Sequence, residues 1–413
     1  MIKYDEFELA NGLKVLVHED PTTPIATLNI LYDVGSKDED KNKTGFAHLF
    51  EHFMFEGSKN ILEFDDEMQK AGGDNNAFTT NDFTNYYSTL PASNIETAFW
   101  LESDRMLELD FSKESLATQI SVVSEEFKET CINKPYGDMW HIINDMAYKT
   151  HSYKWPTIGY SLEHIEAITL QETKDFFYKY YRPNNAVLTI AGGVKTEEMK
   201  ILAEKWFGDI PAGEKHVRNL PKEEKQTETR RKTVEANVPI DNIFIAFHVG
   251  ARLCDDYYAT DLLSDILGSG PSSRLYKDLV KAQKLCGSIN CYLSGTDDAG
   301  LLLIEAKLND DVSMEAAEKA IFESLEKIKN DLVPEYELEK VKNKTLNYLA
   351  FSNISNVNKA FNLAYYKTIG HLNLMNDEKD FFKAVKTSEI QAAAQKYLNI
   401  ENSSILYYKA NKN

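Results

Sequence analysis

The first sixty residues alternate between apolar and polar positions in a pattern that predicts strands followed by a helix. Two alternating apolar runs within residues 7–17 are separated by Asn11-Gly12, a dipeptide typical of hairpin turns. Residues 25–34 are predicted to form a further strand, and residues 45–54 a helix.

Strands such as residues 186–191 alternate with long amphipathic helices through the rest of the first half. We therefore expect an α/β fold of the α+β sandwich type, in which mostly antiparallel sheets are packed with helices.

A polar, charged stretch at residues 211–236 is predicted to be a linker, with domains at 1–210 and 237–413. Residues 25–35 are echoed after it by residues 241–250, and a short acidic loop and a helix follow in both places. This parallel order indicates two homologous domains of about 200 residues, related by duplication. The predicted helix that follows residues 241–250 carries no histidine. It has Asp261, Ser264 and Asp265 instead.

Composition and charge serve mainly to exclude classes of partner and location. The 413 residues are 43% hydrophobic and carry a formal net charge of −19, which disfavours nucleic acid as a partner. The four cysteines form no CxxC pair, so free thiols in a reducing compartment are expected. No signal-like segment and no run of 18 apolar residues is visible, so we expect no membrane span and a cytoplasmic location. A chain trimmed of its signal would look the same, and would fit the periplasm.

The chemistry is concentrated in the predicted helix at residues 45–54. His48 and His52 lie four residues apart, about 40° around a helix axis, and so present two imidazoles on one face, as zinc requires. Glu51 reaches the same face and can act as general base on a zinc-activated water, passing the proton to the leaving amine. The alternative is a helix with two satisfied histidines, but the apolar neighbours and the His-x-x-Glu-His pattern favour a metallopeptidase site.

The chain resembles the pitrilysin/insulinase family of zinc peptidases, which includes the mitochondrial processing peptidase. The blocks at residues 48–57 and 72–79 and the duplicated domains carry the likeness, which extends over nearly the full length. It implies hydrolysis of unfolded peptides with one Zn²⁺ per chain. It also implies a third ligand, a Glu roughly 75 residues beyond His52 on another helix, where this sequence offers Glu125, Glu126 and Glu129.

Helix periodicity ranks these three acids. An apolar stripe defines the buried face of the helix that bears them: Leu116, Ile120, Val123 and Phe127. Glu126 falls at the edge of this stripe, whereas Glu125 lies about 160° from Phe127 on a solvated face, and Glu129 is equally far from Phe127. We therefore expect Glu126 to be the third ligand, although the segment alone would be interpreted as a surface charge cluster.

The block at residues 72–79 is predicted to be an edge strand beside the metal. An exposed edge holds a peptide by main-chain hydrogen bonds, and the resemblance implies that Asn76, Ala77 and Phe78 contact the substrate. A plain hairpin strand with Phe78 in the core is the alternative.

Two departures from the family pattern stand out. Gln119 replaces a second Glu seven residues before the ligand, but can still hydrogen-bond beside the metal. An Arg and a Tyr of self-sufficient members are missing, because Val280 and Gly287 occupy their positions, and Arg274 and Tyr276 are interpreted as structural.

We therefore expect a zinc metallopeptidase that forms the metal-bearing subunit of a heterodimer, whose paralogous partner supplies the Arg and Tyr. A homodimer is the other possible assembly. The alternative function is a catalytically idle, metal-binding scaffold subunit, which the intact His48, Glu51 and His52 disfavour.

Overall fold

The computed structural model describes residues 1–411, which divide into two compact units. The first unit consists of residues 1–127, 155–220 and 350–377, and the second of residues 128–154, 221–349 and 378–413. The domains predicted from the sequence were contiguous, whereas each compact unit contains one segment from the other half of the chain. The helices that cross a boundary are α11 (Glu335–Ser352) and α13 (Leu374–Ala384).

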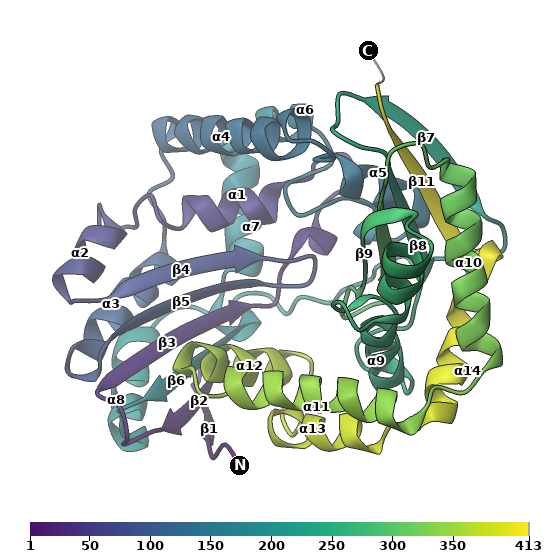
Figure 1. Ribbon diagram of the computed structural model, residues 1–413. Coiled ribbons are helices and arrows are strands. Elements are labelled where there is room, and N and C mark those ends of the chain that lie inside the picture. Colours follow the sequence, from purple (N-terminus) through teal and green to yellow (C-terminus); the bar gives the residue numbers. More distant parts are fainter. Residues whose placement is uncertain (412–413) are drawn as a thin grey trace. The chain divides into compact units, whose positions relative to one another are not determined.

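The first unit is built on a six-stranded sheet with the order β1-β2-β6-β3-β5-β4 (Figure 1). Only β2 and β6 pair in parallel. The strands are β1 (Asp5–Glu8), β2 (Lys14–Glu19), β3 (Ile25–Tyr32), β4 (Asp74–Thr79), β5 (Thr84–Pro91) and β6 (Ala186–Gly192). The helices are α1 (Phe46–Phe53), α2 (Phe64–Lys70), α3 (Ile95–Leu107), α4 (Lys113–Phe127), α6 (Leu162–Glu166), α7 (Leu170–Tyr180), α8 (Thr196–Phe207) and α12 (Asn356–Thr368).

The second unit is built on a five-stranded sheet with the order β7-β11-β8-β10-β9, in which only β7 and β11 pair in parallel. The strands are β7 (Arg230–Ala236), β8 (Asn242–His248), β9 (Cys286–Leu293), β10 (Leu301–Leu308) and β11 (Ser403–Ala410). The helices are α5 (Met139–Ala147), α9 (Tyr257–Gly268), α10 (Met314–Asn330) and α14 (Thr387–Tyr397).

The two sheets repeat one connection pattern, and this confirms the predicted duplication. In each sheet a parallel pair is followed by three antiparallel neighbours, so β2, β6, β3, β5 and β4 correspond to β7, β11, β8, β10 and β9. Helix α1 follows β3, and α9 follows the equivalent β8. The mixed, mostly antiparallel sheets packed with helices also confirm the predicted fold class.

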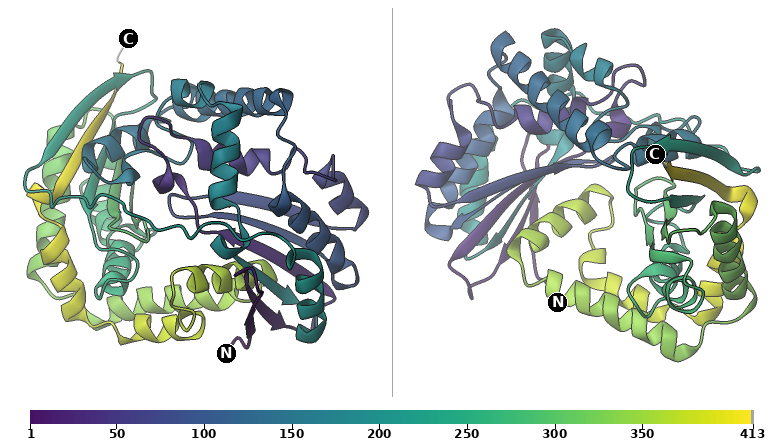
Figure 2. Two further views of the ribbon diagram at one scale, coloured as in Figure 1. Left: turned by 180° about the vertical axis from the view of Figure 1, so that it is seen from behind. Right: turned by 45° about the horizontal axis from the view of Figure 1, so that its top comes forward.

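Residues 128–154 and 350–377, the segments that each unit takes from the other half of the chain, cover sheet faces. We call them the exchanged segments. In the first unit, Leu31 of β3 packs with Leu363 of α12, and the views of Figures 1 and 2 both place α12 against this sheet. The next residue, Tyr32, points to the opposite face, toward Tyr86 and Tyr181. In the second unit, Phe244 of β8 packs with Ile143 of α5. Each sheet is therefore completed by a helix from the other half of the sequence.

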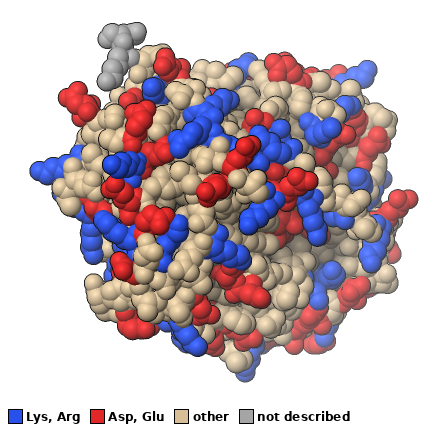
Figure 3. Space-filling model, turned by 90° about the vertical axis from the view of Figure 1, so that its right-hand side faces the viewer, with Lys and Arg blue, Asp and Glu red and all other residues tan. Residues whose placement is uncertain are grey.

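The surface carries both acidic and basic side chains. On the face drawn in Figure 3, basic and acidic side chains are interspersed without an extended area of one sign. Among residues 1–411, no helix combines the length and apolar character needed to cross a membrane.

Candidate metal centre

Helix α1 presents its polar residues together because its apolar residues are buried on the other side. Phe46, Leu49, Phe50 and Phe53 are at most 6% exposed, whereas His48, Glu51 and His52 are only partly buried. The helix begins after Gly45, whose φ of 98° is the left-handed conformation that glycine tolerates. The predicted helix and the shared face of its three polar residues are confirmed.

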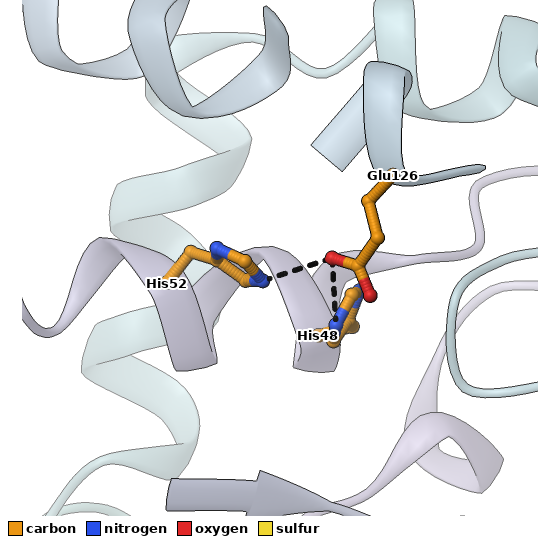
Figure 4. Close-up of side chains that lie close together, drawn as sticks. All are labelled: His48, His52 and Glu126. Carbon is orange, nitrogen blue, oxygen red and sulfur yellow. Dashed lines mark ion pairs between the residues drawn. The ribbon is translucent and has the colours of Figure 1, made fainter. Parts of the chain in front are cut away.

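Glu126, near the end of α4, meets the two histidines. Its Oε2 lies 3.7 Å from His48 Nε2 and 3.3 Å from His52 Nε2. Figure 4 marks both contacts with dashed lines. One ligand atom from each residue lies within 4.8 Å of the others, and this is the only such group of His, Cys, Asp or Glu in the described chain. Tetrahedral zinc with bonds of about 2.0–2.2 Å separates its ligand atoms by about 3.3–3.5 Å. The spacing therefore fits three ligands around one zinc ion.

The electrostatics favour the protonation states that bind metal. Burial lowers the pKa of His48, against the opposite effect of the Glu126 charge. The hydrogen bond with His52 lowers the pKa of Glu126, although burial acts the other way. A neutral imidazole and an ionised carboxylate are the forms that ligate zinc.

The position of Glu126 on α4 agrees with the ranking from helix periodicity. Val123 and Phe127 are buried, Glu126 is intermediate, and Glu125 and Glu129 are exposed. A π-helical turn at Lys128–Asn133 begins two residues after Glu126, and π-helical insertions are frequent at functional sites.

Glu51 lies on the same helix face and is held by a residue of the edge strand. Thr79 Oγ1 donates a hydrogen bond to Glu51 Oε2 over 2.6 Å. Because β4 is an edge strand of the sheet, the candidate base sits directly beside the edge that the sequence assigned to a peptide.

Strand β4 leaves alternate main-chain groups unused by the sheet. Thr80 N donates to Phe83 O at the hairpin, so the alternation of antiparallel pairs turns the main-chain groups of Phe78 toward β5 and those of Ala77 and Thr79 outward. The outward N–H of Ala77 donates to the side-chain Oδ1 of Asn76 at 2.8 Å. The predicted edge strand is confirmed, and its contact with substrate stays a prediction.

Phe78 points away from the face of Thr79 and Glu51. Its ring makes edge contacts with Phe83 at 6.0 Å and with Phe361 of α12 at 5.3 Å. It is partly buried and packed against the apolar cluster of the first sheet, and its contact with substrate stays a prediction.

Gln119 is buried on α4 and donates through Nε2 to Glu56 Oε1. Its Oε1 has no hydrogen-bond partner in the described structure. Gln119 thus contacts a carboxylate that follows α1 in the chain, and its action on the metal ligands stays a prediction.

The second unit has no counterpart of this cluster among the residues described. Asp261 and Asp265 occupy the helix equivalent to α1, and burial together with the Asp265 charge raises the pKa of Asp261 to about 6. Arg274 makes a 2.7 Å hydrogen bond to Glu337, and Tyr276 packs against the core, which agrees with their structural interpretation. Val280 lies in a π-helical segment, and Gly287 in β9.

Sequence reasoning missed Glu39, Thr44 and His164, which fix the start of α1. Glu39 accepts hydrogen bonds from the N–H groups of Gly45 and Ala47, and burial raises its pKa against the opposing effect of these bonds. His164 bonds through Nδ1 to Thr44 Oγ1 at 3.0 Å. An acid in a polar loop gives no sequence signal for such a contact.

Two family profiles match this chain, one after the other along the sequence. The profile described as Insulinase (Peptidase family M16) matches residues 14–159, and that described as Peptidase M16 inactive domain matches residues 167–345. The chain belongs to the insulinase family of peptidases. All four residues of the centre lie within the first match.

Several relatives are named as zinc proteases. Zinc protease PqqE of Helicobacter pylori is 29% identical over 415 residues, covering 98% of this chain and 93% of that protein. The uncharacterized zinc protease YmxG of Bacillus subtilis is 28% identical, covering 83% and 82%. The mitochondrial-processing peptidase subunit beta of Saccharomyces cerevisiae is 29% identical over 51% of this chain and 46% of its own length.

Solved structures agree on the fold. A protease from Helicobacter pylori superposes with a TM-score of 0.94 at 29% identity, covering 99% of this chain and 100% of that one. Pitrilysin superposes with a TM-score of 0.77 at 19% identity, covering 99% of this chain and 45% of its own.

Proposed function

We propose that the chain is a zinc metallopeptidase in which His48, His52 and Glu126 hold one Zn²⁺. The observation that carries the proposal is the convergence of two imidazole nitrogens and one carboxylate oxygen at zinc-ligand spacing, from two helices. The zinc-protease names of the relatives support the choice of metal.

Glu51 is the general base. When bound, zinc supplies Lewis acidity and lowers the pKa of a coordinated water to about 7. Thr79 engages Glu51 Oε2, which leaves Oε1 to take a proton from the attacking water. Glu51 then gives this proton to the nitrogen of the scissile amide. The water oxygen bonds to the carbonyl carbon, the C–N bond breaks, and a carboxylic acid and an amine are formed, which exchange a proton to give carboxylate and ammonium.

The substrate is an extended, unfolded peptide that adds to β4. The outward main-chain groups of Ala77 and Thr79 would pair with it, and this mode of binding selects for an extended backbone more than for particular side chains. Because Asn76 Oδ1 covers the Ala77 N–H, the peptide displaces that carboxamide, which is then free to contact the peptide.

We further propose that a paralogous subunit carrying an Arg and a Tyr completes the active enzyme. The expected positions here hold Val280 and Gly287, which cannot donate side-chain hydrogen bonds. The word subunit in the name of the mitochondrial relative supports an assembly. Pairing with a second copy of this chain is the competing arrangement.

The deciding experiment compares wild type with Glu51→Gln, each alone and with co-purified partner, for zinc content and cleavage of a fluorogenic peptide. Retained zinc with lost cleavage supports the enzyme. Absence of cleavage in the wild type, even with its partner, would favour an idle scaffold. Equal activity of the chain alone and with its partner would overturn the split-site part of the proposal.

A further inference from the structure

The carboxylate of Glu39 is bonded to the first turn of α1. Its Oε2 accepts the N–H of Gly45 at 2.9 Å, and its Oε1 accepts the N–H of Ala47 at 2.8 Å. The side chain is 8% exposed. Both carboxylate oxygens are therefore used on the start of the helix that carries the metal site.

Helix α1 depends on such an external partner. The first N–H groups of a helix have no acceptor within the helix, and Gly45 at the cap position has no side chain to supply one. The helix has only eight residues, a length at which helices are marginal without outside contacts. Glu39 thus replaces a cap from six positions upstream.

Of the three proposed ligands, His48 would be displaced most by a movement of this turn. It directly follows Ala47, and its Nδ1 is buried without a hydrogen-bond partner in the described structure. In metal sites the second ring nitrogen usually fixes the orientation of the imidazole through a hydrogen bond. Without that bond, the place of the His48 ring depends on the backbone of the first turn.

We propose that Glu39 is a positioning residue for the metal centre, which fixes the first turn of α1 and so holds His48 Nε2 at bonding distance from the ion shared with His52 and Glu126. The inference rests on the proposed zinc site.

The loop that carries Glu39 is held by contacts of its two preceding residues, so the position of the Glu39 carboxylate is well defined. Lys37 forms a buried ion pair with Asp82 at 2.8 Å. Asp38 accepts hydrogen bonds from Arg218 Nε and from the N–H of Gly35.

A second anchor keeps the start of α1 attached when Glu39 is changed. Thr44 Oγ1 accepts the N–H of Tyr160 at 2.7 Å and bonds to His164 Nδ1. These contacts lie on the residue before Gly45 and do not involve Glu39. We therefore expect a Glu39→Gln variant to fold, with a first turn that is less well fixed.

The test measures zinc affinity by competition with a chromogenic chelator, and the visible absorption spectrum of the Co²⁺-substituted protein. In Glu39→Gln one amide oxygen remains as an acceptor and the amide NH₂ opposes the second N–H, so zinc should bind about 10–100-fold more weakly, the range for groups that orient ligands. The Co²⁺ spectrum should change because it reports ligand geometry.

Glu378→Gln is the matched control. Glu378 is also 8% exposed, but it pairs with Arg252 in the second unit. Its substitution should lower stability and leave zinc affinity and the Co²⁺ spectrum unchanged. Glu39→Asp, whose shorter side chain reaches one amide, should give an intermediate affinity, and decides the matter if Glu39→Gln does not fold.

Zinc affinity and a Co²⁺ spectrum in both Glu39 variants equal to those of the wild type would overturn the inference. A wild-type protein that binds no zinc would instead overturn the proposed function, and this inference with it. The two failures are distinguished because the wild type binds zinc in the first case only.

Discussion

Thr79 Oγ1 lies 2.6 Å from Glu51 Oε2 and donates a hydrogen bond to it, joining the edge strand β4 to helix α1. This contact holds Oε2 of the Glu51 carboxylate toward β4. Thr79→Val keeps the shape and removes the donor, and a hydrogen bond to a charged group contributes about 1.5–3 kcal/mol. We expect kcat to fall about 10- to 100-fold with zinc content unchanged.

The matched control for Thr79 is Thr89→Val, since Thr89 shares a hydrogen bond with Thr27 within the sheet at 3.0 Å. Its kcat should equal that of the wild type. Equal kcat values for Thr79→Val and wild type would show that the contact does not assist the base.

Removal of the Glu126 carboxylate, the proposed third ligand, should abolish tight zinc binding. Glu126→Gln replaces the ionised oxygen that lies between His48 and His52, and we expect zinc affinity to fall more than about 100-fold, beyond the effect of groups that only orient ligands. Glu125→Gln changes the exposed neighbouring acid and should leave affinity unchanged. Isothermal titration with zinc measures both, and similar affinities for the two variants would assign the ligand elsewhere.

Peptide affinity should depend on one outward amide. Ala77→Pro removes the N–H of Ala77, and proline is tolerated on an edge strand where the N–H faces outward. With about 1.5 kcal/mol lost per hydrogen bond, the KM for a fluorogenic peptide should rise about 10-fold while zinc affinity stays constant. Ala77→Gly keeps the N–H and serves as control, and an unchanged KM in Ala77→Pro would contradict edge-strand binding.

Acid should weaken the first unit through Asp38. Burial raises the pKa of Asp38, but hydrogen bonds from His216 and Arg218 outweigh it and lower the pKa to about 2. A carboxyl that titrates lower in the folded state than in the unfolded state stabilises the fold above about pH 4 and loses this stabilisation as the pH falls toward 2. The contribution at neutral pH is about 2 kcal/mol.

Urea midpoints at pH 7, 4 and 2.5 test this contribution. In Asp38→Asn the midpoint at pH 7 should be lower and its decline between pH 4 and 2.5 shallower than in the wild type. Asp331→Asn, at an exposed position, should follow the wild type at every pH. If the urea midpoint of Asp38→Asn falls between pH 4 and 2.5 as steeply as that of the wild type, the stabilising contribution of Asp38 is excluded.

The covering of the first sheet by α12 can be tested by truncation. Leu363 is fully buried against Leu16, Leu31 and Val187, so Leu363→Ala should cost about 2–5 kcal/mol. Hydrogen exchange should show lost protection in β3 and β6. Ile201→Ala, at a 69% exposed position on α8, should change protection by less than about 0.5 kcal/mol, and the same result for Leu363→Ala would exclude the packing.

Local periodicity was sufficient for the elements and for much of the metal centre. Spacing of apolar residues placed β3, β6 and α1 within a few positions of their observed bounds, because each pattern lies within one element. The same reasoning selected Glu126 over its neighbours, since a helix converts sequence spacing into angle. The assignment of Phe78 to substrate contact could not foresee its packing on Phe361, which lies far along the chain.

Contacts between distant segments were beyond such reasoning. Nothing near residues 128–154 or 350–377 marks them as exchanged, because their amphipathic patterns fit any sheet face. Glu39 gave no signal either, since its role depends on the distance to Gly45 after folding and not on its own neighbours. The hydrogen bond from Thr79 to Glu51 is likewise set by the packing of α1 against β4 after folding.

The placement of α12 also determines when the first sheet can be finished during synthesis. Strand β6 ends at Gly192, whereas α12 begins at Asn356, 164 positions later. At 5–20 residues per second, the nascent sheet waits roughly 8 to 33 s with one apolar face uncovered. We therefore expect the emerging protein to need a chaperone on that face until α12 has left the ribosome.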